Sequence, residues 1–90
     1  MGPVAERLRD KLQQSFEPER LDITDDSARH AGHSGARPEG ETHFTVTIVS
    51  PAFAGVSRIE RQRRVYGVLA DELAGPVHAL SVKALAPGEG

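Results

Sequence analysis

The chain has 90 residues, 38% of them apolar, and a formal net charge of −2, which together fit one small domain with a modest core. The weak net charge gives no bulk attraction to nucleic acid or to a membrane surface, and no apolar run reaches the length of a membrane span. The chain has no cysteine, which excludes disulfides and thiolate metal ligands of its own.

The first predicted element is an amphipathic helix of about three turns. Pro3 suits the first turn of a helix, where its missing N–H costs nothing. Pro18 is predicted to end the helix. Apolar residues recur every four positions between these prolines, namely at Val4, Leu8, Leu12 and Phe16. The alternation of Leu21 and Ile23 with polar residues then predicts a short strand.

A polar, glycine-rich loop is predicted from about Asp25 to Glu41, and it contains His30 and His33. The strand Thr42–Val49 follows, with His43 near its start and apolar residues alternating with threonines. Because the two strands are neighbours in the chain, we expect them to form an antiparallel hairpin. A loop this long in a short domain is uncommon without a function or disorder to explain it.

The residues 50–55 predict a turn or a single helical turn, with Phe53 anchored in the core. Ser57 and Glu60 have the spacing of a capping box and predict the start of a second helix. The helix is expected to run to about Ala74 and to stop at Gly75 and Pro76. Its predicted apolar face consists of Ile59, Tyr66, Leu69, Ala70 and Leu73.

A last strand is predicted over Val77–Ala84, on which His78 shares a face with Leu80, and the tail 87–90 is expected to be frayed. The element order predicts one domain of the α+β class, a two-layer sandwich in which helices cover one face of a three-stranded mixed sheet. The expected core comprises Phe44, Val46, Ile48, Leu80, Val82, Leu8, Leu12, Tyr66 and Leu69.

Several motifs together resemble the BolA family over nearly the whole chain. They are H-A-G-H-S-G, G-E-T-H-F-T-V-T-I-V-S, F-A-G-V-S-R, R-R-V-Y and E-L-A-G-P-V-H-A-L-S-V-K-A. The resemblance implies a BolA-like domain with αββααβ order, related to type II KH domains, which agrees with the order predicted from periodicity. It also implies a partner, a monothiol glutaredoxin, with which BolA-like proteins share a [2Fe-2S] cluster. Some relatives are described as DNA-binding regulators of stress response and cell shape.

The resemblance assigns the cluster-binding role to His78, in V-H-A-L, and to a histidine of the long loop. We expect His33, between Gly32 and Ser34, to be that ligand, with His30 and His43 as alternatives. His43 is expected to point away from the core and to line the open face of the sheet. Imidazoles bind iron, but a chain without cysteine needs thiolates from elsewhere, which a glutaredoxin with glutathione would supply. The isolated chain is therefore predicted to be a monomer without a cofactor.

The second candidate site is the basic start of the second helix, formed by Arg58, Arg61, Arg63 and Arg64. Such a run is usually a solvated face, but it could contact DNA phosphates. The segment Gly32–Gly35 matches a G-x-x-G clamp, yet lies between strands rather than between helices. No nucleophile elbow or P-loop is present, so catalysis is not expected. The chain start lacks a secretory signal pattern or evident organellar targeting, and we predict a cytoplasmic location.

Overall fold

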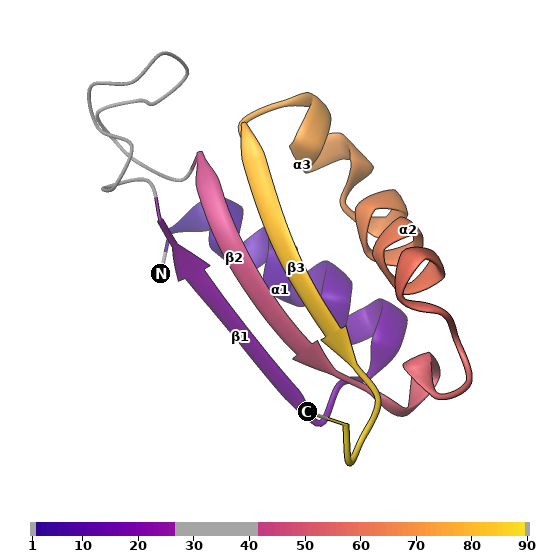
Figure 1. Ribbon diagram of the computed structural model, residues 1–90. Coiled ribbons are helices and arrows are strands. Elements are labelled where there is room, and N and C mark those ends of the chain that lie inside the picture. Colours follow the sequence, from indigo (N-terminus) through magenta and orange to yellow (C-terminus); the bar gives the residue numbers. More distant parts are fainter. Residues whose placement is uncertain (1, 27–41, 90) are drawn as a thin grey trace.

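The computed structural model describes residues 2–26 and 42–89. The elements, labelled in Figure 1, occur in the predicted αββααβ order, with the second long helix divided in two. They are α1 (Pro3–Phe16), β1 (Arg20–Asp25), β2 (His43–Val49), the short 3-10 helix η2 (Pro51–Phe53), α2 (Arg58–Val68), α3 (Ala70–Ala74) and β3 (Ala79–Leu85). None of the helices in these two ranges is long and apolar enough to cross a membrane.

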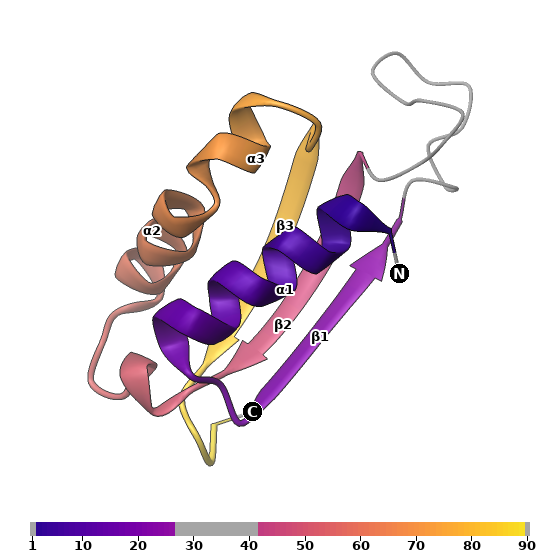
Figure 2. The same ribbon diagram turned by 180° about the vertical axis from the view of Figure 1, so that it is seen from behind.

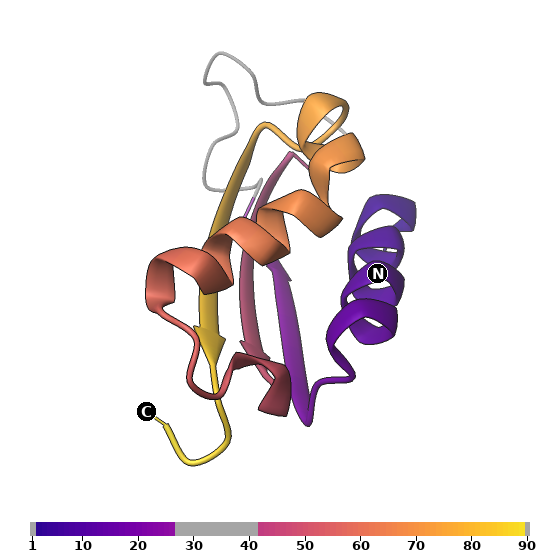
Figure 3. The same ribbon diagram turned by 90° about the vertical axis from the view of Figure 1, so that its right-hand side faces the viewer.

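The three strands form one mixed sheet in the order β1-β2-β3. Strands β1 and β2 pair antiparallel, with Leu21 opposite Ile48, while β2 and β3 pair parallel, with Val46 opposite Val82. The helices lie on one side of the sheet, as Figures 2 and 3 show from behind and from the side. The α+β class, the two layers and the antiparallel hairpin are therefore confirmed.

Helix α1 forms where the four-residue spacing of apolar side chains predicts it. Pro3 occupies the first helical position, and all four predicted apolar residues, together with Ala5, are buried. Glu17 ends the helix in the left-handed region, at φ 44°, and donates its N–H to the Gln13 carbonyl at 3.0 Å. Pro18 follows at once and cannot continue the helix.

The core contains the strand residues that alternation assigns to it. Phe44, Val46 and Ile48 are at most 2% exposed, so the predicted register of β2 is right. Leu8, Leu12 and Leu69 are also buried, while the predicted core residues Leu80, Val82 and Tyr66 are half-buried. Strand boundaries differ from the predictions by one or two residues.

The second long helix departs from the prediction in two ways. It breaks at Leu69, two residues after Gly67, a residue type that weakens helices. Its buried face also runs through Arg61, Val65 and Leu69, at a spacing of four, and leaves Ile59 71% exposed. Ala70 is likewise exposed. The predicted apolar face was therefore wrong at both of these positions.

The predicted turn at residues 50–55 is confirmed as η2. Phe53 is fully buried, and its ring centroid lies 5.0 Å from that of Phe16. The Ser50 hydroxyl donates to the Phe16 carbonyl at 2.5 Å and accepts from the Ala52 N–H at 3.1 Å. One buried serine thus joins the end of β2 to the end of α1.

Candidate functional site

His78 lies just before β3, at the end of the sheet where β2 begins. Its backbone N–H donates to the Thr42 carbonyl at 2.7 Å, and the N–H of Ala79 reaches the same oxygen at 3.1 Å. Val77 beside it is 2% exposed, whereas His78 itself is exposed. The prediction that His78 lies within the strand was wrong by one residue, but the sheet still fixes its backbone.

His43 is the neighbour of His78 across the two strands. The two ring centroids are 5.4 Å apart, with ring planes at 55°. The Nδ1 atom of His43 lies 2.8 Å from the Thr42 hydroxyl oxygen. The side chain is only 8% exposed, so the expectation that His43 lines an open face was wrong. Contact with the His78 ring and with buried Thr42 helps to cover it.

The structure therefore brings together two of the four candidate histidines, whereas His30 and His33 lie outside the described residues. Residues 2–26 and 42–89 contain no group of three or more side chains able to hold a metal ion. The residues on either side of the segment that carries His30 and His33 meet at this end of the sheet, where the Asp26 N–H donates to the His43 carbonyl at 2.7 Å. Within the described part, this end of the sheet offers two imidazoles as nitrogen ligands.

Buried Glu72 of α3 supports the segment that leads to His78. Its carboxylate is 2.8 Å from the Lys11 ammonium and 3.8 Å from Nε of Arg7, both on α1. Its backbone carbonyl accepts the N–H groups of Gly75, at 3.2 Å, and Val77, at 2.9 Å. One residue thus joins α3 to α1 and closes the turn that places His78.

The arginine cluster divides into one buried and three exposed residues. Arg58, Arg63 and Arg64 are exposed, and the last two share Glu60 as a partner, at 4.0 Å and 3.4 Å. Arg61 is only 6% exposed. The prediction that Arg61 belongs to an exposed phosphate-contacting face was therefore wrong.

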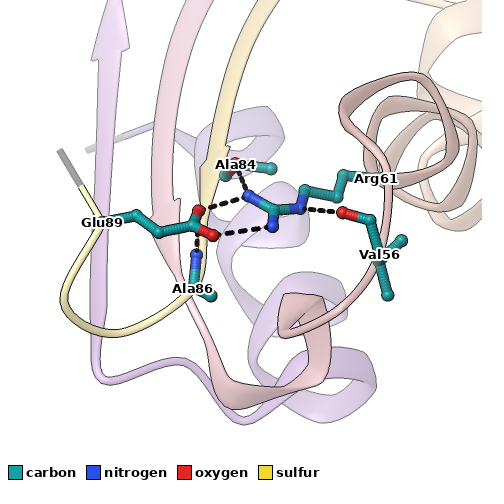
Figure 4. Close-up of polar contacts among 5 residues, drawn as sticks. All are labelled: Val56, Arg61, Ala84, Ala86 and Glu89. Atoms are coloured by element: carbon teal, nitrogen blue, oxygen red, sulfur yellow. Dashed lines mark hydrogen bonds and ion pairs between the residues drawn. The ribbon is translucent and has the colours of Figure 1, made fainter.

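The guanidinium of Arg61 is held from three sides, as Figure 4 shows. It donates to the Val56 carbonyl at 2.8 Å and to the Ala84 carbonyl at 3.1 Å. Two further bonds reach the carboxylate of Glu89, at 2.5 Å and 2.9 Å. A planar fork donating to both oxygens of one carboxylate is the strong form of this interaction.

Glu89 is the other half of this arrangement. The Arg61 hydrogen bond, aided by the Ala86 N–H at 2.9 Å, lowers the pKa of its carboxyl to about 2. Its own N–H donates to the Ala86 carbonyl at 3.1 Å, across a turn in which Gly88 has φ +85°. The prediction of a frayed tail was thus wrong for residues 87–89, because a side chain that looked solvated is an anchor.

With this geometry established, the sequence was compared with those of known proteins. A sequence profile of the BolA family, described as BolA-like protein, matches residues 12–89. The chain belongs to the BolA family. The family resemblance of the sequence motifs is confirmed, and with it the fold that the resemblance implies.

Two curated relatives and one solved structure illustrate the similarity of this BolA-like chain. It is 44% identical over 89 residues to BolA-like protein 1 of Pongo abelii, covering 99% of this chain and 62% of the relative. It is 43% identical over 93 residues to SufE-like protein 1, chloroplastic/mitochondrial, of Arabidopsis thaliana, covering 99% of this chain and 25% of the relative. The solved structure is the BolA domain of SufE1 from Arabidopsis thaliana. It has a TM-score of 0.89 and 43% identity, and the match covers 100% of this chain and 99% of that one.

The BolA-like chain thus spans about 62% of the length of one relative and a quarter of the other. The sequence analysis did not identify two carboxylates that support the candidate sites, Glu72 and Glu89. Each pairs with a basic residue far away in the chain, so no local spacing could have revealed either pair. Glu72 does stand in the motif E-L-A-G-P-V-H that leads to His78, and that adjacency was the available signal.

Proposed function

We propose that this BolA-like chain is a non-catalytic adaptor that shares a [2Fe-2S] cluster with a monothiol glutaredoxin carrying glutathione. The observation that carries the proposal is the exposed His78, whose ring lies 5.4 Å from that of His43 at the end of the sheet. The histidine-bearing loop joins the sheet at the same end. An exposed imidazole on a fixed backbone is suited to bind a metal that a partner presents.

The chemistry of the cluster explains why a partner is needed. A [2Fe-2S] cluster is held by thiolates, and two imidazoles replace two thiolates on one iron in Rieske centres. This chain has histidines and no cysteine, so it matches the imidazole half of such a ligand set. The partner's cysteine and glutathione would supply the thiolates. His78 would be one ligand of the chain.

The second ligand is proposed to be His33, with His30 and His43 as alternatives. His43 is the alternative nearest to His78, but its Nδ1 already contacts the Thr42 hydroxyl at 2.8 Å. A metal on His43 would therefore use Nε2 and leave Nδ1 with Thr42. A loop histidine would instead close over the cluster after docking, and the ordering of the loop would reduce the affinity.

The test is to mix the chain with its cognate glutaredoxin carrying a [2Fe-2S] cluster, and to record visible absorption and circular dichroism. We expect a one-to-one complex with a changed spectrum, while the chain alone is a colourless monomer. His78→Ala should abolish the change, and His33→Ala should weaken it more than His30→Ala or His43→Ala. The complex should also weaken as the pH falls through the histidine range, because ligation needs neutral imidazole.

An unchanged cluster spectrum with the wild-type chain would overturn the proposal and favour DNA-binding regulation instead. In that alternative the contacts would come from Arg58, Arg63 and Arg64, which are exposed, rather than from Arg61. Duplex affinity would fall steeply with salt, and Arg58→Ala would reduce that slope by roughly one unit. A cytoplasmic location stays a prediction, since one relative has a chloroplastic/mitochondrial name.

A further inference from the structure

A hollow lies between the first turn of α2 and the last half of β3. It has a volume of about 630 Å³, and half of its lining residues are charged, with Val82 and Leu85 among its apolar walls. The charged lining residues are Arg58, Arg61, Lys83 and Glu89. His78 precedes the first residue of β3, whereas this hollow lies along its last residues, so the two sites occupy opposite ends of one strand.

The floor of the hollow already binds a carboxylate of the chain itself. Figure 4 shows the Glu89 carboxylate between the Arg61 guanidinium and the Ala86 N–H. A buried guanidinium that donates to both carboxylate oxygens, with a backbone N–H beside it, is a carboxylate-binding arrangement. The chemistry of the hollow therefore suits acidic groups.

The lining carries more positive than negative charge, although the charge of Arg58 also acts on the Glu89 carboxylate. Arg58 and Lys83 are exposed and make no ion pair within the described residues, whereas Arg61 is neutralised by Glu89. Three positive groups thus face one negative group, and the hollow has an excess of two positive charges. The side chains of Val82 and Leu85 add an apolar wall beside these cations.

We propose that this hollow binds an acidic segment of a partner protein. Carboxylates of that segment pair with Arg58 and Lys83, and an apolar side chain contacts the wall formed by Val82 and Leu85. The Arg61–Glu89 pair remains as the floor. A peptide is favoured over DNA because the chain itself supplies a carboxylate here. The next two arginines, Arg63 and Arg64, are also turned to Glu60 rather than to the hollow. The site goes beyond the proposed cluster function and does not depend on it.

The test uses the full chain and an acetylated, amidated peptide of sequence AELEA, with AQLQA as its matched neutral peptide. Titration followed by backbone amide NMR should shift the signals of Arg58, Gln62 and Lys83 with the acidic peptide only. Affinity should fall as salt is added, because the pairs are exposed to solvent. The signals of His43 and His78 should not move, which separates this site from the cluster site.

Substitutions then locate the contacts. Among residues 2–26 and 42–89, Arg58 and Lys83 are in no ion pair, so Arg58→Gln and Lys83→Gln should leave folding intact. Each should weaken the binding of AELEA about two- to fivefold. Arg63→Gln, which removes an equal charge from an exposed position outside the hollow, should leave the affinity unchanged. Glu89→Gln should tighten binding about two- to fivefold by removing the one negative group, provided circular dichroism shows the variant folded.

Four outcomes would overturn the proposal. The first is no shift at millimolar AELEA in low salt. The second is equal binding of AQLQA, and the third is equal weakening by Arg63→Gln. Tighter binding of a DNA duplex than of AELEA, lost in Arg58→Gln and Lys83→Gln, would also overturn it and assign the hollow to phosphate.

Discussion

Strand β3 follows an exposed histidine, His78, at one end and accepts a hydrogen bond from a buried arginine of α2, Arg61, at the other. The fold holds these two residues by different groups. At His78 the backbone N–H donates a hydrogen bond to the Thr42 carbonyl, and the ring is left exposed. At Arg61 the fold holds the side chain instead, because two backbone carbonyls and a carboxylate accept hydrogen bonds from its guanidinium. The comparison teaches that a polar side chain is available to a ligand only where the fold uses its backbone instead.

The largest expected effect is on the core beneath the Arg61 end of the sheet. Phe53→Ala removes a fully buried ring that packs on Phe16, and it should lower the free energy of unfolding by about 3–5 kcal/mol. Urea unfolding followed by circular dichroism measures the loss. The matched control is Ile59→Ala, which truncates a side chain that is 71% exposed and should change stability little. Comparable losses in the two variants would contradict the burial of Phe53.

At the His78 end, the next largest effect is expected for Glu72. Glu72→Ala leaves Lys11 without its closest partner and should cost about 1–3 kcal/mol of unfolding free energy. Hydrogen exchange at the His78 N–H should also become faster, because the turn that leads to it loses its tie to α1. Asp71→Ala is the control, since Asp71 is 94% exposed and only 3.8 Å from the same lysine. An unchanged His78 exchange rate in Glu72→Ala would show that the turn is held by other contacts.

Acid titration should destabilise the Arg61 end of the sheet. The folded pKa of Glu89 is about 2, below its ordinary value of 4.5, so its contribution to stability is present above pH 4.5. That contribution is lost as the pH falls from 4.5 towards 2, when the carboxyl is protonated. Urea midpoints measured across this range should fall less in Glu89→Gln than in wild type. Glu19→Gln, at an exposed position, should follow wild type, and a Glu89→Gln curve parallel to wild type would contradict the pairing.

The smallest expected effect is that of His78→Ala on stability. The imidazole is exposed and the anchoring N–H is retained, so the free energy of unfolding should change by at most about 0.5 kcal/mol. The same variant is expected to abolish the cluster spectrum, which would separate function from folding at this end. Arg61→Ala should do the reverse, lowering the melting temperature while the spectrum forms. Loss of stability in His78→Ala would mean that its ring is structural.

Local pattern was enough for much of the fold. The four-residue spacing of α1, the alternation in β2 and the cap at Ser57 were each read correctly, because each depends on residues close in the chain. The hydroxyl of Ser57 accepts the Glu60 N–H at 3.2 Å, as its spacing predicts. The second helix was predicted less well, because its inward face contains Arg61, which had been assigned to an exposed basic surface.

The sequence by itself determined the family, the element order, the core face of the sheet and the identity of His78 as the leading ligand candidate. Only the tertiary structure decided that His43 is buried beside His78, and that Arg61 is withdrawn from solvent by Glu89. The reason is that helix and strand periodicity acts over a few residues, whereas these contacts join residues 28 or more positions apart. Whether such a side chain is exposed depends on which distant group the folded chain places against it.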